Sequence, residues 1–371
     1  MWRFARQILL HDRFKFAVAT AGVSISVLLV IVQIGLYLGF MGNASALIDH
    51  ADADVWVAAE ATDAFDFASP IDERVVYRVA EVPGVAKTEK VILAFGQIRG
   101  AEGNAEGVEV IGIEPSATML RPWNVVEGSV LARPDGIVVD ETEYAKLQID
   151  ALDQRREISG SRARVDGLTH GIRSFTTSPY VWTNLAAARS FTRLDETQLT
   201  YVLVKAEPGV DARELAARIG KIPHVEAYTK AELSARTQGY WSSRTGVGAG
   251  FFTTAVIGVI VGVVVVGQIL YSSTLEHIKE YGTLKAMGAA NGEVVRVIVY
   301  QALMTAAAGF AVGGTLALVA RAVMNEANLS VAITPSLLAA TAALTVMMCS
   351  GSSLLSITKV LRLDPASVFK A

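Results

Sequence analysis

Four apolar stretches, at residues 16–41, 250–273, 293–322 and 335–358, constrain the fold of this chain more than any other feature. A bilayer core of roughly 30 Å is crossed by about 20 apolar helical residues, so each stretch is long enough for one transmembrane helix. The fourth follows Thr334 and opens with Pro335, a hydroxyl cap and a first-position proline that predict a helix start. The first could instead be a cleaved signal peptide, because Ala44-Ser45-Ala46 resembles a cleavage site. The apolar core of a signal peptide is about 7–15 residues long. The first stretch is longer than that, so we interpret it as a membrane anchor.

The charges beside these stretches predict how the chain faces the membrane. Segments 1–15, 274–296 and 359–371 together carry ten Lys/Arg residues, whereas the short loop 323–334 carries none. Basic residues are enriched on the cytoplasmic side, so both termini and the segment 274–292 are expected in the cytoplasm. Residues 42–249 are then expected to form one extracytoplasmic domain.

Small residues four apart occur in three of the stretches, as Gly35-x-x-x-Gly39, Gly258-x-x-x-Gly262 and Gly309-x-x-x-Gly313. Such pairs let helix backbones approach closely, which predicts a packed bundle but leaves open whether the contacts lie within or between chains. No Asp, Glu, Lys or Arg lies in the middle of a stretch, which disfavours an ion-coupled transporter. Gln33 is polar at this depth and could form an interhelical hydrogen bond or contact a substrate.

Several functional classes are disfavoured by what the chain contains. No G-x-x-x-x-G-K-(S/T) motif is present, since Gly220-Lys221 lacks the upstream glycine and the following hydroxyl. The five histidines are scattered singly, so no metal site is expected, and the single cysteine, Cys349, cannot form an intrachain disulfide. No catalytic motif is found. Residues 42–249 carry 30 Asp/Glu against 22 Lys/Arg, which argues against binding nucleic acid.

The extracytoplasmic block contains an approximate repeat of two β-α-β units. In the first, a strand at 54–59 precedes a helix that Ser69-Pro70 would start, followed by a strand at 91–95. In the second, a strand at 201–204 precedes a helix that Asp211 would start. This helix would end at residues 222–225, before the segment 226–229. Two such units predict a split, ferredoxin-like α+β fold. The intervening residues contain short strands at 108–113, 136–139 and 180–183, a helix at 141–147, and a basic hairpin with arginines at 155, 156, 162 and 164.

Residues 274–292 separate the second and third stretches and combine apolar with charged side chains at helical spacing. Lys285 near the end of this helix would interact favourably with its dipole, and Gly288 would cap it. Asn291 and Glu293 would begin the next helix. The simplest alternative is a solvated turn between two spans. The residues that we expect to contact a soluble partner are Glu276, Lys279, Glu280, Tyr281, Gly282, Leu284, Lys285, Met287 and Gly288.

The run from Glu280 to Gly288 resembles the cytoplasmic loop of FtsX/MacB-type permeases, whose pattern is approximately E-x-G-x-L-(K/R)-A-(M/L)-G. In that family the loop carries motion from an ATP-hydrolysing partner to the membrane helices, so the resemblance implies that the nine residues named above couple this chain to an ATPase. A basic residue is common in the family a few positions before the glutamate; His277 occupies that region here, and Lys279 could substitute for it. Residues 1–15 read as an amphipathic helix fit to lie in the membrane interface, and the tail 359–371 contains a matching Asp364-Pro-Ala signature. Asp54-Val-Trp-Val and Ala68-Ser-Pro-Ile are similar to the subgroup of stand-alone permeases that export glycolipid or hemin.

The resemblance implies a membrane α-helical bundle of four transmembrane helices plus an extracytoplasmic α+β domain, a ferredoxin-like porter unit with a strand-rich insertion. It implies a non-enzymatic permease subunit of an ABC exporter in the bacterial plasma (inner) membrane. ATP and Mg would be bound by two copies of a partner ATPase, and two copies of this chain would pair. Membrane lipid and a periplasmic membrane-fusion protein are further candidate partners. Gln33, Phe40, Phe251 and Phe252 would line the path of an amphiphilic cargo such as lipid, glycolipid or hemin.

Two other functions stay open. An FtsX-like transducer would transport nothing and would activate an extracytoplasmic cell-wall hydrolase, although such members usually have a smaller outer domain. A receptor or scaffold would have no ATPase partner.

Overall fold

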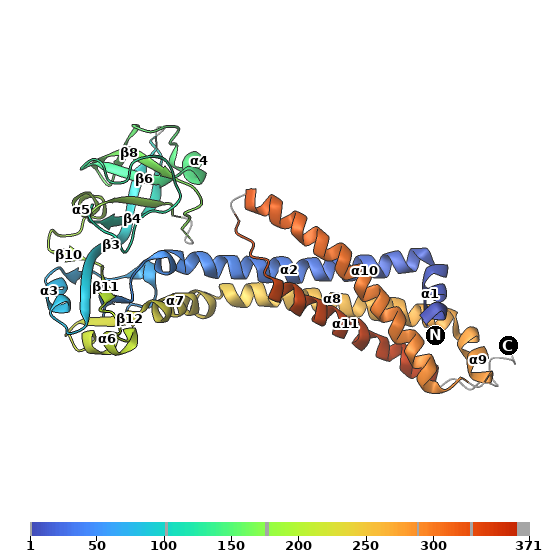
Figure 1. The fold of residues 1–371 in the computed structure, drawn as a ribbon. Coiled ribbons are helices and arrows are strands. Elements are labelled where there is room, and N and C mark those ends of the chain that lie inside the picture. Colours follow the sequence, from blue (N-terminus) through green and yellow to red (C-terminus); the bar gives the residue numbers. More distant parts are fainter. Residues whose placement is uncertain (1, 101–102, 175–177, 288, 327–328, 362–371) are drawn as a thin grey trace. The chain divides into compact units, whose positions relative to one another are not determined.

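The computed structural model describes residues 2–100, 103–174, 178–287, 289–326 and 329–361 (Figure 1). The chain divides into two compact units, one formed by Met1–Gly39 with Val247–Ala371 and the other by Phe40–Gly246. We call these the membrane unit and the α+β unit. The predicted tail beyond Leu361 and the predicted cap Gly288 lie outside the described residues.

Four helices are long and apolar enough to cross a membrane, as expected from the sequence. They are α2 (Arg13–His50), α8 (Val247–Glu276), α10 (Asn291–Glu326) and α11 (Pro335–Leu361), accompanied by the shorter α1 (Trp2–His11) and α9 (Ile278–Ala286). At the start of α11, the Thr334 hydroxyl accepts a hydrogen bond from the Leu337 backbone N–H at 3.2 Å. Glu293 lies in the first turn of α10 and accepts from the Ala290 N–H at 3.1 Å.

Helix α2 continues to His50, well past residue 41, where the sequence pattern ended the first span. Its last turns belong to the α+β unit, where Leu47 and Ile48 are buried in one core with Trp56 and Phe65. Burying a leucine or isoleucine side chain contributes about 1.5–3 kcal/mol, which favours continuing the helix beyond the apolar stretch.

All three glycine pairs are packing contacts within this chain, and all involve α2. A side chain at Gly258 would meet Leu29, and one at Gly262 would overlap Ser26 and Met348. Gly309 and Gly313 of α10 approach Val23, Ser24 and Val27 in the same way. Gly35 and Gly39 lie in α2 itself and face the extended segment 330–332. Helix α2 therefore approaches α8, α10 and the segment 330–332 at positions where one partner has no Cβ.

The α+β unit is built on one ten-stranded sheet in the order β12-β1-β11-β3-β4-β9-β6-β8-β5, in which β7 pairs with β3 and β8. The strands are β1 (Val55–Ala59), β3 (Val85–Arg99), β4 (Ala105–Ile113), β5 (Val125–Gly128), β6 (Gly136–Asp140), β7 (Arg155–Ile158), β8 (Ser161–Thr169), β9 (Tyr180–Asn184), β11 (Tyr201–Ala206) and β12 (Val225–Thr229). A separate pair joins β2 (Ile71–Asp72) to β10 (Gln198–Leu199). The helices are α3 (Val75–Ala80), α4 (Tyr144–Leu147), α5 (Leu185–Thr192), α6 (Ala212–Ile219) and α7 (Lys230–Gly239).

The predicted ferredoxin-like unit is confirmed at one end of this sheet. Strands β1 and β3 flank α3, strands β11 and β12 flank α6, and the four strands stand in the order β12-β1-β11-β3 with every neighbour antiparallel. Asp211 caps α6, its carboxylate accepting from the Arg213 and Glu214 backbone N–H groups. The strand-rich insertion continues the same sheet through the 15-residue β3, which pairs with β4.

Two helix predictions in this unit were wrong in part. Ser69-Pro70 starts no helix, because Ile71 instead pairs with Leu199 in the small sheet and is buried, and α3 begins only at Val75. The segment predicted as a helix at 141–147 opens as the 3-10 turn η2 (Glu141–Glu143), capped by Asp140, and becomes α-helical at α4.

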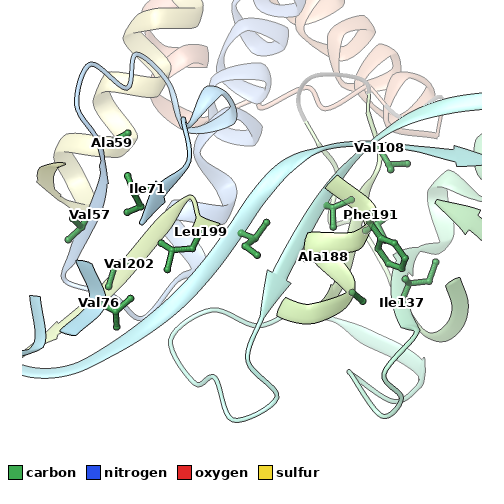
Figure 2. Packing of buried hydrophobic residues seen from close by; sticks show 14 of the residues in the cluster. Val57, Ala59, Ile71, Val76, Val108, Ile137, Ala188, Phe191, Leu199 and Val202 are labelled. Atoms are coloured by element: carbon green, nitrogen blue, oxygen red, sulfur yellow. The ribbon is translucent and has the colours of Figure 1, made fainter. Parts of the chain in front are cut away.

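The sheet has a hydrophobic core on each side, because side chains alternate along a strand. In β1, Val55 and Val57 face the core covered by α3, α5 and α6, whereas Trp56 and Ala58 face the other. Figure 2 shows the first core, where Phe191 and Ala188 of α5 lie beside Val108 and Ile137. Leu47 and Ile48 of α2 and Leu233 of α7 pack in the second.

The segment that leads from the α+β unit into α8 is fastened by a buried carboxylate. Trp241, in the short helical segment η3 (Tyr240–Arg244), donates its indole N–H to Asp66 Oδ2 at 3.0 Å. Asp66 lies in the turn η1 (Phe65–Phe67) and is only 3% exposed. Burial raises the pKa of the Asp66 carboxyl to about 6, and the Trp241 hydrogen bond only partly offsets this. The chain preceding α8 is therefore held by a group that titrates near neutral pH.

Replacing Asp66 by asparagine is expected to remove one part of the pH dependence of stability. The folded state holds the Asp66 proton up to about pH 6, whereas the unfolded carboxyl loses it near 3.8, so stability falls as pH rises between these values. A pKa shift of this size corresponds to a change of about 3 kcal/mol in the free energy of unfolding. The introduced asparagine keeps an acceptor for Trp241, so the D66N protein should lack this fall. Chemical denaturation of both proteins across this pH range measures the difference, and parallel curves would contradict the assignment.

Candidate coupling surface on the membrane unit

Helix α9 joins the end of α8 to the start of α10, and charged side chains make contacts at its beginning. The Glu276 carboxylate, at the end of α8, pairs with the Lys15 ammonium at the start of α2. The His277 imidazole Nδ1 lies 2.7 Å from Glu280 Oε2, within the first turn of α9. The first contact joins the end of α8 to the start of α2 directly before α9, and the second is local to α9.

One face of α9 is buried, and its central residue is Tyr281, which is 1% exposed. The Tyr281 hydroxyl donates to Gln301 Oε1 at 3.4 Å. Burial raises the pKa of Tyr281 to about 12, so the hydroxyl stays a hydrogen-bond donor at neutral pH. Its ring packs in a cluster formed by Ala5, Ile8, Val294, Val297 and Ile298, with Leu284, Tyr300 and Ile357 partly buried against it. A displacement of α9 must therefore move α10 and α1 as well, since packed side chains resist deformation.

The opposite face of α9 is exposed and carries most of the charged residues predicted for coupling. Residues three, four and seven apart lie on one side of a helix. Lys279, Glu280, Thr283 and Met287 follow this spacing, Glu276 ends α8 just before α9, and all five are exposed. Met287, just past the end of the helix, is 72% exposed. We call these five residues the α9 outer face.

The structure separates the predicted coupling residues into two groups. Glu276, Lys279, Glu280 and Met287 lie on the α9 outer face, whereas Tyr281 and Gly282 are buried. Leu284 and Lys285 are half-buried. Tyr281 and Gly282 are therefore covered by the protein, unlike the residues of the α9 outer face. The coupling role of each residue stays a prediction.

Helix α1 packs one of its faces within the protein, and its predicted place in the membrane interface stays a prediction. Ala5 and Ile8 are buried in the cluster around Tyr281, and the Trp2 ring meets the Tyr300 ring edge-on at 5.5 Å. Sequence reasoning missed Lys15, Gln301 and the apolar face of α1 as parts of this site. Of these three, only the apolar face of α1 left a signal in the sequence, which is the amphipathic pattern of residues 1–15.

The residues predicted to line a cargo path belong to both units, and their role stays a prediction. Phe251 of α8 meets Tyr37 of α2, with ring centroids 6.3 Å apart, while Phe252 is 65% exposed. Gln33 is half-buried in α2, and Phe40 belongs to the α+β unit. Within the described ranges, no group of His, Cys, Asp or Glu side chains could hold a metal ion.

Two protein-family models match this chain, and together they cover most of it. The model of the MacB-like periplasmic core domain matches residues 16–222, more than half of the chain, and that of the FtsX-like permease C-terminal region matches residues 252–365. The chain belongs to the FtsX/MacB family of ABC transporter permeases. A permease of this type implies an ATPase partner, and the candidate spans mark a membrane protein.

Relatives agree with this family. An uncharacterized ABC transporter permease of Mycobacterium tuberculosis strain H37Rv is 22% identical over 361 residues, covering 96% of this chain and 95% of the relative. A second permease from that strain is 24% identical over 291 residues, covering 77% and 76%. The crystal structure of the periplasmic region of MacB from Actinobacillus actinomycetemcomitans overlaps 49% of this chain and 90% of its own, with 8% identity and a TM-score of 0.38. The extracellular domain of the transporter YknZ from Gram-positive bacteria overlaps 47% of this chain and 98% of its own, with 10% identity and a TM-score of 0.37.

Proposed function

We propose that this FtsX/MacB-type permease is the membrane subunit of an exporter that extrudes an amphiphilic cargo, using ATP bound with Mg and hydrolysed by a separate ATPase subunit. The observation that carries the proposal is the two-faced helix α9. Its outer face is exposed and could receive a soluble protein, and its inner face is packed on α1 and α10 through Tyr281. Both termini and α9 lie in the cytoplasm in this proposal, and the α+β unit lies outside.

The contacts of α9 suggest how motion would spread from the ATPase. A push on the α9 outer face is carried by Tyr281 to Gln301 and the start of α10. The pair between Glu276 and Lys15 carries it to the ends of α8 and α2. Both helices continue along the chain to the α+β unit, α2 without interruption and α8 through η3 and α7. Two copies of the chain would pair, each recruiting one ATPase copy.

The cargo is proposed to be a lipid, a glycolipid or hemin, entering beside the outer parts of α2 and α8. Exposed Phe252 and the Tyr37–Phe251 pair support an amphiphilic molecule, because aromatic rings favour the membrane boundary. A periplasmic membrane-fusion protein would bind the α+β unit if export crosses a second membrane. A transducer that activates a cell-wall hydrolase is the alternative function.

Purification of the full chain from its native membranes tests the proposal. We expect a P-loop ATPase to copurify, and the complex in lipid vesicles to move a fluorescent lipid or hemin only when ATP is hydrolysed. ATP-dependent activation of a cell-wall hydrolase without cargo movement would favour the transducer. Absence of any copurifying ATPase activity would contradict both.

A further inference from the structure

The α+β unit contains a basic hollow that the proposed function does not use. It has a volume of about 560 Å³ and lies where the end of β3 meets the hairpin of β7 and β8. This volume lies within the range of about 300–1,000 Å³ that is typical of small-molecule sites. Its lining residues are Arg99, Gly100, Gly103, Arg155, Arg156, Glu157, Gly160 and Arg162. We call it the arginine hollow.

Strand pairing places several arginines on one side of these three strands. Glu157 of β7 stands opposite Arg99 of β3 and Arg162 of β8, and Arg155 stands opposite Arg164. Directly opposed residues of antiparallel strands point to the same face, and like charges in such pairs are destabilising. The other face is apolar, with Ile98, Ile158 and Ala163 fully buried. The hairpin thus exposes Arg155 and Arg162 and leaves Arg155 opposite Arg164.

Nearby carboxylates neutralise only some of these charges. Arg99 pairs with Glu157 at 3.2 Å, and Arg164 pairs with Asp153 at 2.9 Å. Arg156 is turned away, its guanidinium donating to the Gln148 carbonyl and to Gln154. Across the residues with described positions, no carboxylate forms an ion pair with Arg155 or Arg162. These two guanidinium groups therefore supply the unbalanced positive charge of the hollow.

The surroundings keep this charge accessible. Gly103 and Gly160 have φ of +86° and +91° and carry no side chain, and an added Cβ at either position would meet nothing within 4 Å, while Arg155 and Arg162 are exposed. The domain around the hollow is acidic, with 30 Asp/Glu against 22 Lys/Arg in residues 42–249. A local positive site on an acidic surface attracts a small anion more readily than an extended polyanion, which the remaining surface would repel.

We propose that the arginine hollow binds a phosphate-bearing group, either a lipid headgroup or a free phosphate compound. Guanidinium forks match phosphate oxygens with paired, charge-assisted hydrogen bonds. A phosphate between Arg155 and Arg162 would also relieve the repulsion between Arg155 and Arg164. The inference does not depend on ATP-driven export, since binding is measured on the full chain without any ATPase.

The test uses the full chain in phosphatidylcholine nanodiscs. The protein is titrated with inorganic pyrophosphate and with polyglutamate and, separately, incubated with vesicles containing phosphatidic acid. The double variant Arg155→Gln, Arg162→Gln removes the two unbalanced charges. Losing one charged hydrogen bond costs about tenfold in affinity, so this variant should bind pyrophosphate about 100-fold more weakly. The control Arg74→Gln, Arg78→Gln removes two exposed arginines around α3 and should bind as the wild type does. Matching melting curves for the three proteins establish that each is folded.

The outcomes separate the sources and the alternatives. Saturable pyrophosphate binding lost only in the Arg155/Arg162 variant supports a free phosphate compound, and the same pattern with phosphatidic acid vesicles alone supports a lipid headgroup. If the control variant bound the probes as weakly as the Arg155/Arg162 variant, the loss of affinity would come from the change in total charge, and the proposal would be overturned. It would also be overturned if wild type bound neither probe, or bound only polyglutamate, which would indicate an acidic protein partner.

Discussion

Replacing Gly313 by alanine is expected to destabilise the membrane unit by about 1–3 kcal/mol, as over-packing does in tightly packed interiors. A Cβ at Gly313 would lie 2.6 Å from the Ser24 carbonyl oxygen and 2.8 Å from Val27 Cβ, both on α2. Because one of these atoms belongs to backbone, the two helices must separate. The hydrogen bond of 3.2 Å from the Ser24 hydroxyl to the Gly309 carbonyl would then lengthen as well.

The neighbouring Gly314 is the matched control for this prediction. A Cβ at Gly314 meets nothing within 4 Å, on the same helix and with the same change in helix propensity. Alanine there should leave stability unchanged or raise it slightly, since alanine favours helices by about 1 kcal/mol over glycine. Thermal unfolding in nanodiscs compares the two variants. Equal midpoints would mean that α2 and α10 do not pack as described.

Replacing Met287 by alanine is expected to weaken ATPase binding at least about tenfold without destabilising the chain. Met287 is the most exposed large apolar side chain of the α9 outer face, and burying a methionine at an interface is worth about 1.5–3 kcal/mol. Each 1.4 kcal/mol corresponds to about tenfold in affinity. Charge reversal at Glu280, on the same face, should have a similar effect. Affinity is measured by titrating the copurified ATPase onto the permease in nanodiscs.

Met347 supplies the control for the Met287 prediction. It is 64% exposed, similar to Met287, but lies in the span α11, where lipid covers it in our account. The variant Met347→Ala should therefore bind the ATPase as the wild type does. If both variants lost binding equally, or if neither did, the α9 outer face would not be the docking surface.

Much of the fold follows from periodicity and length. Apolar runs predicted four spans, and strand and helix patterns predicted the ferredoxin-like order, because both depend on local sequence. The glycine pairs predicted close helix packing, but only the structure shows that all three converge on α2 in one chain. Helix α2 continues beyond residue 41, where the apolar pattern ended the first span, because its last turns are stabilised by the core of the α+β unit. Likewise, Ser69-Pro70 has the local chemistry of a helix start, and pairing of Ile71 with the distant Leu199 overrides it.

The sequence identified the segment that contains the candidate site, but it did not show which residues of that segment form an exposed surface. The motif identified nine residues of 274–288, yet it could not separate the buried Tyr281 from the exposed Met287. The buried face depends on α1, which is almost 270 residues away along the chain, and on the pair of Lys15 with Glu276. Contacts between such distant segments leave no periodic signal in either one. The same holds for Trp241 and Asp66, whose hydrogen bond joins residues 175 positions apart.

The side of the membrane on which α9 lies is the most direct test of the account. The chain has one cysteine, Cys349, so the background Cys349→Ala accepts single cysteines at Lys279 on the α9 outer face and at exposed Glu207 in the α+β unit. A membrane-impermeant maleimide is then applied to inside-out and right-side-out vesicles. We expect the Lys279→Cys protein to be labelled only in inside-out vesicles and the Glu207→Cys protein only in right-side-out ones. Labelling of Lys279→Cys from the outer side alone would place α9 beyond the reach of any cytoplasmic ATPase and contradict the account.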